Sequence, residues 1–148
     1  MLVLQCFGKE IHIMNRADIV LPGSYYGYGA LNEFIASFAQ SEGYSDLFVE
    51  GLQLAMKEAF VNAVKHGNRE RYDLTVSCSF TAVADTLLVS VRDCGNGFNP
   101  DELPNPIDAR NLSRLSGRGV YIIRSIAEII ALERDRAGSV LMLRYYPY

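Results

Sequence analysis

Apolar residues recur at two different spacings along this chain, and the changes of spacing divide it into elements. Residues 2–14 alternate loosely between apolar and polar, which predicts an opening strand, and residues 18–21 suggest a second short strand. A turn follows at residues 22–24. Between residues 28 and 40 the apolar positions recur every three or four residues, which predicts a helix that ends at Gly43.

A second helix is predicted to begin at Ser45 or Asp46 and to reach about His66. Gly67 would end it, because glycine is the residue favoured just after a helix. Part of this helix is apolar at helical spacing and should face a core. The residues of this stripe are Leu52, Met56, Ala59 and Ala63.

Two strands are predicted after the second helix. Residues 74–78 and residues 87–92 each alternate apolar with polar, and residues 84–85 form a turn between them. This pattern predicts an antiparallel hairpin. Near the end of the chain, residues 139–146 predict a further strand that closes the sheet.

A long segment with little periodicity separates the hairpin from a last helix. The residues between Gly97 and Gly117 include three prolines. A loop of this length inside a compact domain is usually functional or the sign of a mistaken assignment. From Gly117 onward the apolar residues return to helical spacing, which predicts a helix that extends to Ile130.

The composition is that of an ordinary soluble globular protein, with 49% hydrophobic and 21% charged residues among 148. A chain of this length is expected to form a single domain over residues 1–148. The net charge of −3, without a basic stripe along the sequence, argues against direct binding to nucleic acid.

The cysteines and the N-terminus bear on where the protein works. Cys6, Cys78 and Cys94 are far apart and show no paired spacing, so they suggest neither a disulfide framework nor a zinc site. The N-terminus lacks the pattern of a signal peptide, and nowhere do eighteen apolar residues run together. We therefore expect a cytoplasmic protein that neither is secreted nor spans a membrane.

The second helix carries the first group of candidate functional residues. Glu58, Asn62 and His66 follow one another at steps of four, so they form one column on the helix beside its apolar stripe. The amide oxygen of an asparagine can join the shell of a hard cation, and a neighbouring carboxylate can orient or deprotonate a hydroxyl. Polar residues are also ordinary on a solvated helix face, which is the competing interpretation.

Asp93, Cys94, Gly95, Asn96 and Gly97 form the second candidate, directly after a predicted strand. A carboxylate at this place can accept a hydrogen bond from an exocyclic amine such as that of adenine. The glycines would let the backbone approach a flat ring closely. The same five residues also make a good turn, and in isolation this interpretation is slightly favoured.

The third candidate is the start of the last helix at Gly117, Arg118 and Gly119. Backbone N–H groups and the positive end of the helix dipole favour phosphate oxygens there, and Arg118 or Arg114 could add charge. Glycine pairs at helix starts are common as well. The sequence lacks a P-loop, and its strand pattern does not give the βαβ unit that a dinucleotide-binding fold requires.

In this order and with these separations, the three segments resemble the N, G1 and G2 boxes of the GHKL ATPase superfamily, which has the Bergerat ATP-binding fold. The resemblance covers residues 8–146 and is strongest for the bacterial anti-sigma factor serine/threonine kinases. Glu58 to Gly67 matches Glu-x-x-x-Asn-Ala-x-x-His-Gly, and Asp93 to Phe98 matches Asp-x-Gly-x-Gly-Phe. The implied fold is an α/β (α+β) sandwich, in which helices cover one face of a single mixed, mostly antiparallel sheet.

The resemblance also implies a role for each matching residue. Glu58 would be the general base that orients the attacking hydroxyl, Asn62 the Mg²⁺ ligand and Asp93 the reader of the adenine of ATP. Gly95 and Gly97 would be positions of close backbone approach. The other nucleotide-binding residues that the resemblance implies are His66, Phe98, Gly117, Arg118, Gly119 and Val120.

Residues 98–116 would form a lid over ATP, and Gly117 to Val120 would hold its phosphates. His66 matches the pattern without a firm role, with contact to the lid or to the phosphates as the expectation. Arg110, Arg114 and Arg118 are candidates to contact phosphate.

The function that the resemblance implies is that of a cytoplasmic bacterial serine/threonine protein kinase of the anti-sigma type. Such a kinase transfers the γ-phosphoryl group of Mg·ATP to a serine or threonine of a small anti-anti-sigma protein with a STAS domain. The resemblance leaves open that this chain also sequesters a sigma factor. From the family, we further expect a homodimer formed through the sheet edge or the first helix.

Three alternatives stay open. A non-catalytic, nucleotide-gated module would bind ATP only to hold a protein partner, and Glu58 is necessary for transfer without proving it. The detached ATPase part of a histidine kinase fits less well, because no helix pattern provides a phosphoacceptor histidine followed by a dimerising partner helix. The last alternative is a domain of the same class that binds no nucleotide.

Overall fold

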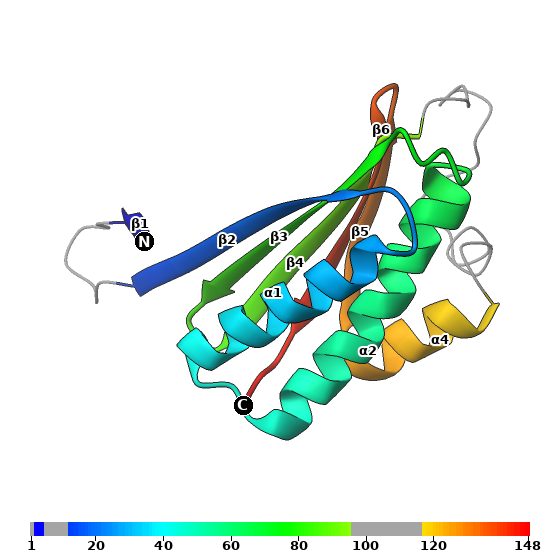
Figure 1. The fold of residues 1–148 in the computed structure, drawn as a ribbon. Helices are drawn as coiled ribbons and strands as arrows, with labels where there is room; N and C mark the ends of the chain where they lie inside the picture. The colour runs from blue at the N-terminus through cyan, green and yellow to red at the C-terminus, as the bar shows by residue number, and fades with distance from the viewer. Residues whose placement is uncertain (1, 5–11, 96–116) are drawn as a thin grey trace.

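The computed structural model describes residues 2–4, 12–95 and 117–148, and within them six strands form one sheet in the order β1-β2-β3-β4-β6-β5 (Figure 1). Every pair of neighbouring strands in this order is antiparallel. The strands are β1 (Leu2–Leu4), β2 (His12–Pro22), β3 (Thr75–Val83), β4 (Thr86–Asp93), β5 (Glu128–Asp135) and β6 (Gly138–Tyr145).

The helices lie together on one face of this sheet (Figure 1). They are α1 (Gly27–Glu42), α2 (Asp46–Asn62), the short π-helix η1 (Ala63–Gly67) that continues α2, and α4 (Gly117–Ile126). α2 packs between α1 and α4, and η1 lies against β4. The fold class predicted from the sequence, a sheet covered on one face by helices, is confirmed.

The ends of α1 and α2 follow from local sequence. Gly43 ends α1 in the left-handed conformation, with φ of 72°, and its N–H donates to the carbonyl groups of the last turn. Ser45 begins α2, because its Oγ accepts a hydrogen bond of 3.2 Å from the Phe48 N–H. Both predicted helix boundaries are confirmed, and Ser45 is the capping residue of the two that were considered.

The core lies between the helices and the sheet. Along β3 and β4 every second residue is buried, as expected for strands with one covered face. The predicted apolar stripe of α2 is buried at all four positions. The largest fully buried side chains include Leu31 and Ile35 of α1, Met56 and Phe60 of α2, Phe80 of β3 and Tyr145 of β6. Burial of each side chain of this kind stabilises the fold by about 1.5–3 kcal/mol.

The first long strand differs from its prediction. β2 runs without a break from His12 to Pro22, where the sequence suggested the end of one strand and a second short one. The apolar alternation is interrupted by Asn15, which lies on the covered face with Ala17 and Ile19 and donates from its Nδ2 to Glu42 Oε1 of α1. Arg16 and Asp18 lie on the open face of the sheet, where they form an ion pair of 3.2 Å. Of the predicted opening strand, Leu2–Leu4 forms β1 and residues 12–14 belong to β2. Residues 5–11 lie outside the described residues.

The last helix is shorter than predicted. α4 ends at Ile126, and the chain continues as strand β5 where a helix to Ile130 was expected. β5 pairs with β6 along its length, and a register shift between Ile129 and Ala131 disturbs the alternation that would have revealed a strand. The spacing of Ile126 and Ile130 fits a helix, so sheet pairing overrides the local pattern here.

Candidate functional site

A cleft is lined by residues of α2, η1, β4, β5 and β6, at the end of the sheet where β4 ends and β6 begins. Its empty volume is about 450 Å³ when the open solvent at its mouth is included. Three of the predicted site residues line it together, namely Asn62, His66 and Asp93. The other lining residues are Ala59, Ala63, Gly67, Val91, Leu132, Arg134, Ser139 and Leu141. The wall is therefore largely apolar, with a few polar groups, as is typical of small-molecule sites.

Asp93 is the buried acid of the cleft, with 6% of its surface exposed. Its Oδ1 accepts hydrogen bonds from the Gly95 N–H at 3.1 Å and from the Ser139 N–H at 3.0 Å. Burial raises the pKa of Asp93, and the two backbone hydrogen bonds and the charges of Arg134 and Arg92 oppose that rise. The carboxylate is thus held by backbone groups through one oxygen.

Glycines from three elements enclose Asp93. A Cβ on Gly67 of η1 would collide with Asp93 Oδ2, and a Cβ on Gly95 would collide with the Gly67 carbonyl oxygen. Gly138, at the start of β6, has φ of 140°, and a Cβ added there would collide with the Asp93 carbonyl oxygen. Chain segments can approach this carboxylate so closely only because these positions have no side chain.

Gly67 therefore has a different reason from the one predicted. It was predicted to follow the helix, and it is instead the last residue of η1, without a positive φ. The N–H of Asn68 donates to the Ala63 carbonyl at 2.8 Å, which is the wider turn of a π-helix. The helical segment thus ends at Gly67 itself, and close contact with Asp93 explains why this residue is a glycine.

Asn62 is the last residue of α2 and is 6% exposed. Its Nδ2 has no hydrogen-bond partner among the described residues. A buried amide with an unpaired polar atom is costly unless something else binds it. Because Asn62 lines the cleft, a hydrogen-bond acceptor on a bound ligand could satisfy this Nδ2 group.

His66 lies on η1 at the mouth of the cleft and is exposed. Partial burial, and then the charge of Lys65, lower the pKa of His66. The imidazole is consequently neutral at physiological pH and can accept or donate a hydrogen bond.

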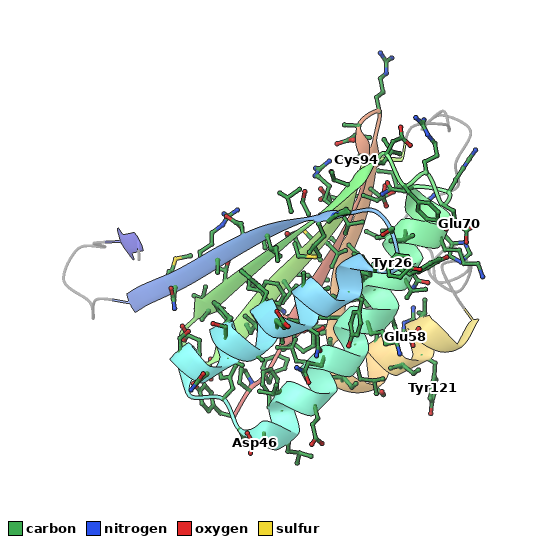
Figure 2. All side chains as sticks on the ribbon, in the orientation of Figure 1. Tyr26, Asp46, Glu58, Glu70, Cys94 and Tyr121 are labelled. Atoms are coloured by element: carbon green, nitrogen blue, oxygen red, sulfur yellow. The ribbon has the colours of Figure 1, made fainter. Side chains whose placement is uncertain are left out.

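Glu58 lies one turn before Asn62 on α2 and does not line the cleft. Its side chain is half-buried, and Figure 2 shows it on the part of α2 that passes α4. The Glu58–Asn62–His66 column thus leads from a partly exposed carboxylate into the cleft.

The remaining predicted site residues are divided between described and undescribed parts of the chain. Gly117, Arg118, Gly119 and Val120 form the first turn of α4, with Gly119 and Val120 buried. Val120 does not line the cleft. Gly97, Phe98 and the predicted lid at 98–116 lie outside the described residues.

Asn68 is a site residue that sequence reasoning missed. It is 1% exposed, its Oδ1 accepts from the Cys94 N–H at 2.8 Å, and its Nδ2 donates to the Thr75 carbonyl at 3.1 Å. The side chain thereby joins the end of η1 to the end of β4 and the start of β3. Its signal in the sequence was an asparagine directly after the His-Gly pair at the end of the predicted second helix.

The β5–β6 hairpin supplies three more residues that were missed, namely Arg134, Gly138 and Ser139. They were not assigned to the cleft because the sequence predicted a helix as far as Ile130 and no strand before residue 139. A glycine followed by an alternating strand was the available signal.

Comparison with known proteins agrees with this geometry. Residues 27–145 match the histidine kinase-like ATPase domain, which accounts for most of the chain. The chain belongs to the histidine kinase-like ATPase family. A domain of this family implies the use of ATP, and the resemblance to the GHKL superfamily is confirmed.

Relatives of this histidine kinase-like ATPase domain are named for a specific activity, that of a serine-protein kinase. The serine-protein kinase RsbW of Listeria monocytogenes is 27% identical over 139 residues, which cover 88% of this chain and 87% of that protein. The serine-protein kinase RsbW of Bacillus subtilis is 26% identical over 140 residues, covering 88% of both. The similarity to these serine-protein kinases therefore extends over nearly the whole domain. In the part of the chain that the structure describes, no helix is long and apolar enough to cross a membrane.

Proposed function

We propose that this protein is an ATP-dependent serine/threonine kinase of the anti-sigma type. Its substrate would be a serine or threonine of an anti-anti-sigma protein with a STAS domain. One observation carries the proposal: α2 and η1 bring Asn62 and His66 into the same cleft as Asp93, although these residues come from different segments of the chain. The relatives named serine-protein kinase support the same activity.

Asp93 would recognise the base of ATP. Its Oδ1 already accepts two backbone hydrogen bonds, which leaves Oδ2 as the oxygen to accept from the exocyclic amine of adenine. Val91, Leu132 and Leu141 provide an apolar wall for the ring. Gly97 and Phe98 belong to this end of the site in the proposal, which draws them from the family pattern.

Asn62 would hold Mg²⁺ through its amide oxygen. Its buried Nδ2 has no hydrogen-bond partner among the described residues and, as a donor, would be satisfied by an oxygen atom of the nucleotide. Mg²⁺ usually takes few protein ligands and completes its shell with phosphate oxygens and water, so a single protein oxygen can suffice. When bound, the ion would neutralise charge on the phosphates during transfer.

Glu58 would act as the general base. The substrate hydroxyl oxygen attacks the γ-phosphorus, the bond to the β–γ bridging oxygen breaks, and ADP leaves while the hydroxyl proton passes to the Glu58 carboxylate. Glu58 is half-buried one turn before Asn62, outside the lining of the cleft, which suits this role because a protein substrate must reach it from outside. The first turn of α4, Gly117 to Val120, would direct its backbone N–H groups to the phosphates.

The proposal extends to setting and partners. A kinase of this type would act in the bacterial cytoplasm, and the same protein would also bind a sigma factor in competition with its phosphorylation substrate. We further propose a homodimer. The edges of the described sheet that are open to a second copy are β1 and β5.

The test is incubation of the protein with Mg·ATP labelled at the γ-phosphate and with STAS-domain proteins of its own organism. The kinase proposal expects label on a serine or threonine of one such protein, lost in Glu58→Gln. Glu50→Gln is the matched control, because Glu50 lies on an exposed part of the same helix and the change is chemically the same.

Each result decides between the proposed kinase and its alternatives. ATP binding without labelling of any candidate would favour the non-catalytic module that holds a partner. Label that persists in Glu58→Gln would contradict the role of Glu58. A protein that binds no nucleotide would contradict the whole proposal.

A further inference from the structure

Arg134 is an arginine inside the candidate nucleotide cleft for which the sequence reasoning provided no role. It lies on β5, opposite Ser139 of β6, and Ser139 is the residue whose N–H donates to Asp93 Oδ1. Arg134 and Asp93 both line the cleft. Strand pairing thus places a cation next to the acid that would recognise the base.

The direction of the Arg134 side chain follows from the register of the hairpin. Its partner Ser139 is on the same face as Leu141, which is buried under the helices, and Leu132 on β5 shares that face. Arg134 is half-buried there, in a wall that is otherwise mainly apolar.

The other arginines near this end of the cleft are placed differently. Arg92 of β4 is on the opposite face of the sheet and lies 3.8 Å from Asp135 in an ion pair. Arg136, in the turn between β5 and β6, is exposed. Of these three arginines, Arg134 is the one that lines the cleft.

Asp93 and Arg134 offer complementary hydrogen-bonding groups. An ionised carboxylate only accepts hydrogen bonds, and a guanidinium only donates them. Adenine carries its exocyclic amine, a donor, directly beside two ring acceptors, N1 on one edge and N7 on the other. One edge of adenine can therefore satisfy a neighbouring carboxylate and guanidinium together.

We propose that Arg134 is a specificity-determining residue whose guanidinium donates a hydrogen bond to the ring nitrogen next to the amine that Asp93 accepts. This inference rests on the proposed nucleotide site and deepens it, because the base would be read by two side chains of opposite charge. The positive charge of Arg134 also opposes the rise in the pKa of Asp93, which favours the ionised carboxylate that the amine requires.

The test compares the dissociation constants of ATP and of two analogues in which a carbon replaces N1 or N7, measured by calorimetry with Mg²⁺. The wild-type protein should bind one analogue roughly ten-fold or more weakly than ATP, the range expected for a hydrogen bond from a charged donor. Arg134→Met should bind ATP more weakly by a similar factor and should no longer distinguish that analogue from ATP.

Arg136→Met is the matched control, since it removes the same charge from the same hairpin at an exposed position. It should keep the wild-type preference. Arg134→Lys keeps the charge with a different donor geometry, so a partial preference is expected and the test stands even if Arg134→Met is unstable.

Three results would overturn the inference about Arg134. The wild-type protein could bind both analogues as tightly as ATP, which excludes a contact to either nitrogen. Arg134→Met could keep the wild-type preference, which assigns the contact to another group. Arg136→Met could lose the preference equally, which reduces the effect to general charge. In all three cases ATP still binds, whereas failure of the proposed function would appear as no binding of ATP by the wild-type protein.

Discussion

At the inner end of the cleft, backbone from three segments of the chain encloses Asp93. Glu58, by contrast, lies outside the lining of the cleft and is half-buried on the surface of α2. Gly67, Gly95 and Gly138 each approach Asp93 or its neighbour so closely that a methyl group would collide. Among the described residues Glu58 takes part in no hydrogen bond or ion pair, and it lies where α2 passes α4 (Figure 2).

This difference teaches which changes separate folding from function. The packing around Asp93 depends on contacts between distant segments, so a change there that adds bulk or removes a hydrogen bond should alter the structure and the binding of nucleotide together. Glu58 is partly exposed on α2, so a change there that keeps the size of the side chain should alter chemistry with little effect on the fold.

The largest effect is expected from Gly67→Ala. The new methyl group would overlap Asp93 Oδ2 and force η1 away from β4, so the free energy of unfolding should fall by about 1–3 kcal/mol and nucleotide binding should be lost. Urea unfolding and calorimetry with ATP measure the two effects. Gly29→Ala is the control, because Gly29 has no atom within 4 Å of the added methyl group and lies in α1, where alanine should raise stability by up to about 1 kcal/mol. Equal behaviour of the two variants would show that the inner end is not closely packed.

Asn68→Ala should have the next largest effect. It leaves the Cys94 N–H and the Thr75 carbonyl without their side-chain partner, at a cost of about 1–3 kcal/mol in the free energy of unfolding. The turn after Asp93 would lose its attachment to η1, so affinity for nucleotide should fall as well. Asn68→Asp keeps the acceptor for Cys94 but turns a carboxylate oxygen towards the Thr75 carbonyl oxygen and buries a charge, so it should lose at least as much in the free energy of unfolding. A variant Asn68→Ala with wild-type affinity would show that this amide does not position the turn.

Asp93→Asn should leave the fold intact while weakening nucleotide binding roughly ten- to hundred-fold, because the amide keeps Oδ1 for both backbone donors but replaces Oδ2 with a donor. Burial raises the pKa of Asp93 above its ordinary value of 3.8, so the ionised group costs stability at neutral pH. That cost is removed as the pH falls through the raised pKa towards 3.8.

Unfolding experiments across this pH range check the sign. Relative to Asp93→Asn, the wild-type protein should gain stability as the pH falls. A relative loss of stability would mean that the backbone hydrogen bonds outweigh burial and that the pKa of Asp93 is lowered.

Glu58→Gln should have the smallest effect on the fold, within about 0.5 kcal/mol in the free energy of unfolding. The rate of phosphoryl transfer should nevertheless fall by about 10²–10⁴-fold, the range for loss of a general base. Unfolding curves together with single-turnover transfer rates make the comparison with Gly67→Ala. A large loss of stability in Glu58→Gln would contradict the expectation that the Glu58 side chain contributes little to the fold.

The sequence by itself determined the features that depend on short-range spacing. Residues three or four apart set the buried faces of α1 and α2, and Gly43 and Ser45 set the boundary between them. The hairpin of β3 and β4 and the Glu58–Asn62–His66 column follow from the same kind of local pattern. The order of the three segments was enough to identify the family, although the roles of individual site residues stay predictions.

Only the tertiary structure decided what depends on distant segments. β5 is a strand because it pairs with β6, although its first residues fit the spacing of a helix. Gly67 is explained by Asp93 and not by the end of a helix, and the Ser139 N–H reaches Asp93 across 46 positions of the chain. Arg134 enters the cleft through the same hairpin. The physical reason is that a periodic pattern reports which face of an element is buried, while close contact between two elements depends on how both of them pack.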